Sequence, residues 1–263
     1  MRVDLVKAHI AANGSVAKDT YLMELRLETE EFLAAPGQFV MLRILDTTDP
    51  LLRRAFSICS LIKPNVIQIM YRVVGKGTRL MKDMKEEETL ELLGPLGNGF
   101  QGPERGKKAV LVSGGIGVAP LFFLASRLKP HDLKFIAGYG SKEDVVPPGL
   151  LGLEEGSVLF ATEDGSCGYH GLVTELFEAE LNKTLSRQLQ VYCCGPWEML
   201  KKLAHICYEY DLDCQVSLES AMACGVGACQ GCAVKASASY PPDYFHVCSH
   251  GPVFSSSDID WEG

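Results

Sequence analysis

The sequence Ala109-Val110-Leu111-Val112-Ser113-Gly114-Gly115-Ile116-Gly117-Val118-Ala119-Pro120 sets the class of the fold. An apolar run typical of a buried strand leads into a glycine-rich turn, and the next residues predict a helix from Pro120 to Leu128. Glycines in such a turn let the backbone approach a pyrophosphate, and the helix N-terminus offers free N–H donors. The spacing differs from G-x-G-x-x-G, so a tight turn without a ligand remains the alternative interpretation.

The same succession of strand, turn and helix recurs further along the chain. Apolar runs at 133–139 and 189–193 predict two more strands, and a helix is expected from Trp197 to about Tyr210. Strands that alternate with helices indicate a parallel sheet, whose ligands bind at the carboxyl ends of the strands. The turns after the apolar runs therefore supply the candidate nucleotide-binding residues Gly114, Gly115, Gly117, Asp164, Gly165, Cys194, Gly195 and Pro196.

Residues 1–101 show a different pattern, in which short apolar stretches are separated by turns. The stretches 21–27, 38–44 and 66–74 are alternating or rich in β-branched residues, and strands at this spacing indicate a small antiparallel barrel or sandwich. One helix is expected from Thr78 to about Met84, with Thr78 as its N-cap.

Two short strings in this region offer groups that suit a flavin nucleotide. In Arg54-Ala55-Phe56-Ser57, an arginine can pair with a phosphate, an aromatic ring can cover a flavin, and a hydroxyl can hydrogen-bond a ring nitrogen. Gly75-Lys76-Gly77-Thr78 precedes the expected helix and is a second possible phosphate site. Each string is weak evidence alone, because Arg53 and Arg54 can equally form a solvated basic pair.

Residues 215–263 are rich in Cys, Gly and Ser and too few to build a large core, so we expect a metal or a partner surface to stabilise them. Four cysteines follow C-x4-C-x2-C…C, the spacing of plant-type [2Fe–2S] ligation: Cys224, Cys229, Cys232 and Cys248. Glycines between them permit a positive φ and close approach to the sulfides. Structural zinc is the alternative; it usually uses paired C-x2-C knuckles, and here only one exists, although His246 and His250 flank Cys248.

The 263 residues carry a formal net charge of −8, which disfavours nucleic-acid binding because that affinity rests on neutralising phosphates. This length allows two domains and a small third. The first residues lack the apolar core of a signal peptide. The most apolar stretch, 109–126, contains three Gly and one Pro, so it is interpreted as strand, loop and helix rather than a membrane span. We therefore expect a cytoplasmic protein whose cysteines are thiols or metal ligands.

Taken together and in this order, the motifs resemble those of the ferredoxin–NADP reductase superfamily. They are an R-x-aromatic-Ser string, a G-x-G-T turn, a G-G-x-G-x-x-P loop and a C-G-P turn. With the cysteine motif added, nearly the whole chain is similar to the electron-transfer subunits of dihydroorotate dehydrogenase B. The supporting strings are PLLRRAFS at 50–57, YRVVGKGTRL at 71–80, LGPLGNGF at 93–100 and VCSHGPVF at 247–254.

This resemblance implies an FAD-binding β-barrel domain over 1–101, an NAD-binding α/β domain over 102–214 and a small [2Fe–2S] domain over 215–263. It implies that the four motif cysteines bind the cluster. It also implies that FAD is held by Arg54, Ala55, Phe56, Ser57, Met70, Tyr71, Arg72, Gly77 and Thr78.

The resemblance also implies an activity and a partner. The chain would be an oxidoreductase subunit that passes electrons from the FMN of a dihydroorotate-oxidising catalytic subunit, through [2Fe–2S] and FAD, to NAD+ in pyrimidine (UMP) biosynthesis. The assembly would be a heterotetramer of two plus two. The flavin must lie between the other carriers because a cluster passes one electron and nicotinamide takes two. No acid–base catalytic residue is expected, since hydride transfer needs alignment more than proton transfer.

Two further choices are open from the sequence. NAD is favoured over NADP because the loops at 140–144 and near 164 lack an arginine cluster for a 2′-phosphate, although Lys142 is present. One alternative function has the same cofactors in a reductase subunit of a hydrogenase, sulfide reductase or bifurcating transhydrogenase, and a copurifying subunit would distinguish it. The other is a colourless, zinc-bearing module that senses nucleotides without catalysis.

Overall fold

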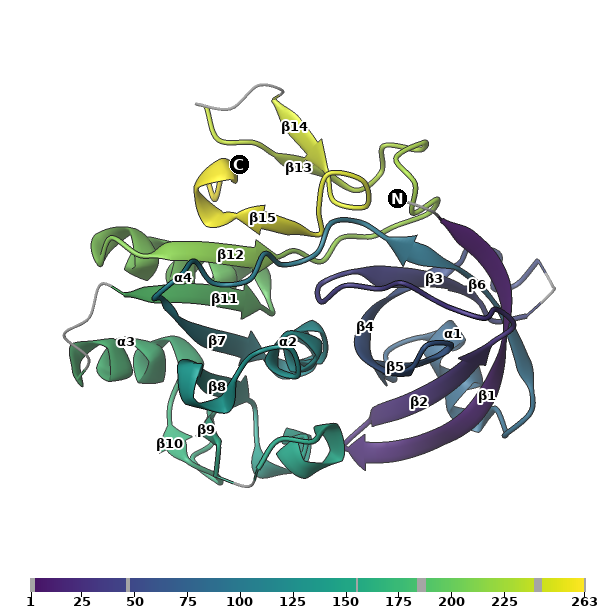
Figure 1. Cartoon of the computed structure of the whole chain (residues 1–263), viewed down its shortest axis with the longest axis horizontal. Coiled ribbons are helices and arrows are strands. Elements are labelled where there is room, and N and C mark those ends of the chain that lie inside the picture. The colour runs from purple at the N-terminus through teal and green to yellow at the C-terminus, as the bar shows by residue number, and fades with distance from the viewer. Residues whose placement is uncertain (1–2, 46–47, 155, 184–187, 239–242, 263) are drawn as a thin grey trace.

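The fold is a barrel, a helix-covered sheet and a cysteine-rich lobe, which follow one another along the chain (Figure 1). This computed structural model describes residues 3–45, 48–154, 156–183, 188–238 and 243–262. Among the helices described, none is long and apolar enough to cross a membrane.

Six antiparallel strands close into the barrel in the order β1-β2-β5-β4-β3-β6. The expected strands fall on β2, β3 and β5, and closure decides for a barrel over a sandwich. Buried and exposed residues alternate along β1, where Ala8 and Ile10 point into the core. The strands are β1 (Asp4–Ala17), β2 (Thr20–Leu27), β3 (Phe39–Arg43), β4 (Arg54–Lys63), β5 (Val66–Arg72) and β6 (Thr89–Leu96).

The helix of the barrel begins earlier than the sequence predicts. α1 (Lys76–Asp83) has Gly75 as its N-cap, so the expectation that Thr78 caps the helix is wrong. Thr78 is the third helical residue, and its hydroxyl accepts hydrogen bonds from the N–H groups of Val74 (3.0 Å) and Gly75 (3.1 Å). A threonine side chain can satisfy these N–H groups from inside the first turn as well as from the cap.

The second sheet has seven strands in the order β10-β9-β8-β7-β11-β12-β15. All neighbouring strands are parallel except β12 and β15. The strand order reverses between β7 and β11, which makes the edge beyond their carboxyl ends the expected ligand site. The strands are β7 (Lys108–Gly114), β8 (Leu133–Tyr139), β9 (Val158–Thr162), β10 (Tyr169–His170), β11 (Leu189–Cys194), β12 (Asp213–Ser217) and β15 (Val253–Ser255).

Helices cover both faces of this sheet. α3 (Val173–Lys183) and α4 (Trp197–Glu209) pack on one face, and the bounds of α4 agree with the prediction. α2 (Val118–Ala125) lies between the other face and β4 of the barrel, which explains why all its residues are buried (Figure 1). It begins two residues earlier than predicted. It also ends earlier, because the backbone N–H groups of Arg127 and Leu128 bond to carbonyls three residues back instead of four.

The C-terminal lobe, residues 219–252, contains a two-stranded sheet of β13 (Ala233–Lys235) and β14 (Tyr244–His246). Such a pair is too small to be stable alone. The lobe is followed by β15, which adds to the large sheet beside β12, so the lobe is fixed to the rest of the molecule. Short 3-10 helices occur at Gly115–Gly117, Pro130–Asp132, Lys142–Asp144, Pro148–Leu151 and Ser256–Asp258.

Candidate functional site

A cavity of about 400 Å³, here called the barrel pocket, opens where the barrel, α2 and the end of β12 meet. Eight of the nine residues predicted to hold a flavin line it: Arg54, Ala55, Phe56, Ser57, Met70, Tyr71, Arg72 and Thr78. They come from β4, β5 and α1, which are far apart in sequence. The structure therefore brings the two weak strings of the first region together in one pocket.

Gly77, the ninth residue, acts from beside the barrel pocket. A Cβ at this position would lie 2.9 Å from Arg54 Nε and 2.9 Å from Ile44 Cδ1. Only glycine therefore lets the Arg54 guanidinium lie against the first turn of α1. A guanidinium beside the N-terminus of a helix is a suitable site for a pyrophosphate.

Tyr71 forms an aromatic wall on the barrel side of the pocket. Its ring lies 6.1 Å from Phe56 in an edge-on arrangement and stacks on Tyr21 at 5.6 Å. Its hydroxyl donates to Asn13 Oδ1 at 2.9 Å, and burial raises the pKa of Tyr71 to about 12. Tyr71 is thus a fixed neutral group that can support a flat ring system.

Sequence analysis missed the far wall of the barrel pocket. Ile116 and Ala119 reach it from the glycine turn and α2, and Ser217–Ser220 and Met222 reach it from the chain after β12. The position of residues 217–220 at the carboxyl end of a parallel strand was the signal that could have identified them. Although Glu219 keeps contact with solvent, its position in the pocket raises the pKa of its carboxyl by desolvation.

A second cavity of about 500 Å³, the sheet pocket, lies at the carboxyl ends of β7 and β8 and beside the first turn of α4. Gly114, Gly115 and Pro196 line it as predicted. The glycine turn and the Cys194-Gly195-Pro196 turn are in contact, since a Cβ on Gly117 would lie 2.3 Å from the Cys194 carbonyl oxygen. Some of the predicted glycines therefore let the two turns pack closely together, and others leave the backbone open to the sheet pocket.

Five other predicted residues do not line the sheet pocket: Gly117, Cys194 and Gly195 lie where the two turns touch, and Asp164 and Gly165 lie in the turn after β9. Gly165 has a φ of +71° in the turn after β9, and Asp164 accepts hydrogen bonds from the Ser166 N–H (2.9 Å) and hydroxyl (2.5 Å). These bonds lower the pKa of the Asp164 carboxyl. Their neighbour Glu163 lines the pocket instead.

The charged lining of the sheet pocket was mostly missed from the sequence. Asp144, Glu163 and Glu198 line it together with two cations, Arg72 and Lys202. Asp144 and Glu163 follow β8 and β9, so their places after parallel strands could have indicated them. Arg72 lines both pockets, which makes it their point of contact.

The four motif cysteines are gathered by the C-terminal lobe. Cys232 and Cys248 are buried, with their sulfurs 3.2 Å apart, close enough for one iron to bind both. Cys224 and Cys229 form the outer pair, and Cys229 is exposed. This division agrees with a two-iron cluster in which each iron takes two thiolates.

Backbone N–H groups point at the sulfurs of this site. Gly227 donates to Cys248 Sγ at 3.1 Å, and Val226 and Cys229 donate to Cys224 Sγ at 3.4 Å. The bond from Val226 is the largest cause that lowers the pKa of Cys224 to about 6. Gly225 and Gly227 have φ values of +74° and +79°, which give the loop the turns these donors need. The loop can thus stabilise an anionic cluster.

The geometry favours a cluster over a single metal ion. Within the described ranges, no three His, Cys, Asp or Glu side chains lie close enough together to hold one ion. His250 Nδ1 accepts a hydrogen bond from the His246 N–H at 2.9 Å. That ring nitrogen is therefore engaged with the backbone and is not free to bind zinc.

The cysteine loop, residues 224–232, lies against the barrel pocket. A Cβ on Gly225 would lie 2.6 Å from Met41 Cγ of β3, so the loop packs on the barrel. Met222, two residues before Cys224, lines the pocket itself. The three sites are therefore contiguous, with the barrel pocket in the middle.

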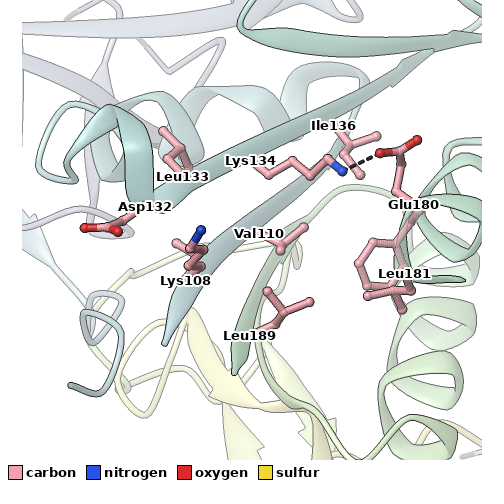
Figure 2. A pocket seen from close by; sticks show the side chains of 11 residues that line it. Lys108, Val110, Asp132, Leu133, Lys134, Ile136, Glu180, Leu181 and Leu189 are labelled. Carbon is pink, nitrogen blue, oxygen red and sulfur yellow. Dashed lines mark hydrogen bonds and ion pairs between the residues drawn. The ribbon is translucent and has the colours of Figure 1, made fainter. Parts of the chain in front are cut away.

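A third cavity, of about 310 Å³, lies at the opposite edge of the large sheet. Figure 2 shows its apolar floor, which includes Val110, Ile136 and Leu189, and the ion pair of Lys134 with Glu180 at its rim. It is formed at the amino ends of β7, β8 and β11, away from the glycine turns. It is therefore no part of the nucleotide site.

Two family models match this chain. Residues 7–100 match an oxidoreductase FAD-binding domain, and residues 219–260 match the iron–sulfur cluster binding domain of dihydroorotate dehydrogenase B. The chain is 39% identical to the "dihydroorotate dehydrogenase B (NAD(+)), electron transfer subunit" of Desulforamulus reducens, over 97% of this chain and 98% of that protein. It is 38% identical to the subunit of the same name from Caldanaerobacter subterraneus, with the same coverage.

Solved structures show the same architecture. The structure of an NADH-dependent reduced ferredoxin–NADP oxidoreductase superposes with a TM-score of 0.81 at 26% identity, over 97% of this chain and 90% of that one. A ferredoxin–NADP+ reductase from Neisseria gonorrhoeae, with bound FAD and NADP, has a TM-score of 0.66 at 21% identity, over 80% of this chain and 92% of that one. The second likeness concerns the fold alone.

Proposed function

The chain belongs to the family of dihydroorotate dehydrogenase B (NAD+) electron-transfer subunits, and from this premise we propose that it links dihydroorotate oxidation to NAD+ reduction. Electrons enter from the FMN of a catalytic partner subunit and leave as a hydride on NAD+. The chain would hold [2Fe–2S] and FAD, which would couple the one-electron chemistry of a cluster to the two-electron chemistry of nicotinamide. This places the chain in pyrimidine biosynthesis.

The observation that carries the proposal is the position of the barrel pocket. Its walls include Ile116 and Ala119 from the glycine turn and α2 on one side, and Ser220 and Met222 from the approach to the cysteine loop on the other. A group in this pocket would lie between the glycine turn and the segment that leads into the cysteine loop. Electron transfer and hydride transfer both need such proximity.

On the flavin side, the proposed roles follow from the pocket lining. Arg54 and the first turn of α1 bind the pyrophosphate, with Gly77 making room for the guanidinium. Phe56 and Tyr71 support the ring system. Ser57, which lines the pocket from β4, donates a hydrogen bond to a ring nitrogen.

On the nicotinamide side, Gly114, Gly115 and Pro196 bring backbone close to the pyrophosphate in the sheet pocket. Gly117, Gly195 and Cys194 hold the two turns together. Asp164 and Gly165 shape the neighbouring turn that presents Glu163. A pocket with three carboxylates and two cations suits NAD better than NADP, whose additional phosphate carries more negative charge.

On the cluster side, Cys224, Cys229, Cys232 and Cys248 would hold the [2Fe–2S] group, which would carry one electron at a time. The exposure of Cys229 and of Val226, which is 50% exposed, makes this loop the entry point for electrons from the partner. We assign the partner as an FMN-containing dihydroorotate dehydrogenase subunit in a two-plus-two assembly in the cytoplasm. The alternative partners considered from the sequence are not favoured, because the full-length relatives bear the dihydroorotate dehydrogenase name.

Reconstitution with the partner tests this proposal. The chain is coexpressed with an FMN-containing dihydroorotate dehydrogenase catalytic subunit, and NADH formation is followed on adding dihydroorotate and NAD+. We expect the complex to form NADH, and the partner alone to form none. A complex that reduces NAD+ only with another donor would overturn the assignment while leaving the cofactor sites intact.

A further inference from the structure

The barrel pocket and the sheet pocket meet at one side chain. Arg72, the last residue of β5, lines both of them, and it also lines a small cavity between them with Thr20, Tyr139 and Asp144. Its side chain is half exposed, at 50%. The direction in which its guanidinium points therefore decides which pocket it serves.

Asp144, which follows β8 of the large sheet, fixes that direction. Its Oδ1 lies 3.5 Å from Arg72 Nη2. Its Oδ2 accepts hydrogen bonds from the Ser141 N–H (3.1 Å) and hydroxyl (2.9 Å). Because one oxygen is anchored twice, the other is presented to Arg72 in a defined position.

The ligand of Arg72 follows from the charges around it. The barrel pocket already has a side chain that can bind phosphate, Arg54, at the first turn of α1. The sheet pocket has three carboxylates, and besides Arg72 its cation is Lys202. A dinucleotide pyrophosphate in the sheet pocket therefore needs Arg72 more than a flavin nucleotide does. A guanidinium that faces one carboxylate at 3.5 Å still has most of its donors available.

We propose that Asp144 is a positioning residue for hydride transfer, which orients Arg72 to bind the pyrophosphate of the nicotinamide nucleotide at the junction of the two pockets. This inference rests on the proposed function. Arg72, predicted from the sequence to hold FAD, then belongs in part to the second nucleotide. Its role is to set how far the nicotinamide end reaches toward the barrel pocket.

The molecule contains a matched control for this pair. Lys18 of the barrel joins the adjacent Glu143 by a backbone hydrogen bond (Lys18 N to Glu143 O, 2.9 Å) and an ion pair (Nζ to Oε2, 3.1 Å). These side chains are 55% and 72% exposed, and neither lines the barrel pocket, the sheet pocket or the small cavity that Arg72 shares with Asp144. Glu143 thus joins the barrel to the segment after β8, as Asp144 does, but it lines neither nucleotide pocket.

The test compares Asp144→Asn with Glu143→Gln in the FAD-containing protein. Asparagine keeps an acceptor for Ser141 and removes the charge that orients Arg72. We expect Asp144→Asn to slow flavin reduction at saturating NADH by about ten- to a hundredfold, with FAD content unchanged. Glu143→Gln should stay within about twofold of the parent, as for a surface pair.

A double-mutant cycle with Arg72→Lys completes the test. If Asp144 acts through Arg72, the Asp144→Asn substitution adds little to the loss in the Arg72→Lys background. Equal losses in the rate of flavin reduction in Asp144→Asn and Glu143→Gln would overturn the proposal. Such a result would indicate a structural contact between the barrel and the segment after β8. Additive losses in the cycle would overturn it as well. Failure of the proposed function has a different signature, since NADH would then not reduce the flavin of the parent protein at all.

Discussion

The cysteine loop and the barrel pocket lie side by side, yet they are built from different kinds of residues. The loop supplies three of the four motif cysteines within nine residues, and Cys248 supplies the fourth. The pocket takes its lining from β3, β4, β5, α1, α2 and the chain after β12. One site is a local motif that depends on covalent ligands, and the other depends on the whole fold. The comparison predicts that one substitution can remove the cluster without loss of FAD, and that another can weaken FAD binding without loss of the cluster.

The largest expected effect is on the local site. Cys232→Ala removes a buried ligand that faces Cys248 at 3.2 Å. Because a small metal-binding lobe folds with its metal, we expect cluster content to fall more than about tenfold. FAD content and the reduction of FAD by NADH should persist. Iron and sulfide assays beside the flavin spectrum measure both. Joint loss of FAD and cluster would break the comparison.

A middle effect is expected at the contact between the two nucleotide turns. In Gly117→Ala, the new Cβ would meet the Cys194 carbonyl at 2.3 Å, so the turns must separate. We expect a loss of about 1–3 kcal/mol in the free energy of unfolding, together with a higher KM for NADH. Urea unfolding and steady-state kinetics are the measurements. Gly102→Ala, with no atom within 4 Å of the new Cβ, is the control and should change neither quantity.

The smallest effect is expected where a single glycine makes room for one side chain. Gly77→Ala places a Cβ 2.9 Å from Arg54 Nε and displaces the guanidinium from the first turn of α1. The Kd for FAD should rise about tenfold, which corresponds to about 1.4 kcal/mol. Titration of the flavin-free protein with FAD gives this value. Gly75→Ala, two residues earlier with open space around the new Cβ, should bind FAD like the parent. Equal weakening in both variants would contradict the claim that Gly77 makes room for the Arg54 guanidinium.

The same contrast explains what the sequence could and could not reveal. The cysteine spacing could predict the cluster ligands because their chemistry is carried by side-chain type and local distance. The strand-turn-helix pattern predicted the parallel sheet and the glycines at its carboxyl edge. Glu198 and Lys202 were missed because their role comes from the placement of α4 beside the pocket, which no local pattern records.

Capping and helix ends were the other errors, and they have local causes. Thr78 satisfies N–H groups from within the first turn, so a glycine rather than a threonine precedes the helix. α2 is buried on all sides between sheet and barrel, and its apolar sequence therefore has no amphipathic edge to mark where it stops. The place of Arg72 in the lining of both pockets was likewise beyond the resemblance, which implied a role with FAD alone.

The most direct test of the account is an anaerobic ultraviolet–visible spectrum of the purified chain before and after NADH, with iron and sulfide assays. The account predicts flavin bands over broad cluster absorbance, about two irons and two sulfides per chain, and bleaching of both features by NADH. A colourless protein, or one whose flavin NADH does not bleach, would contradict the contiguous path from the sheet pocket through the barrel pocket to the cysteine loop.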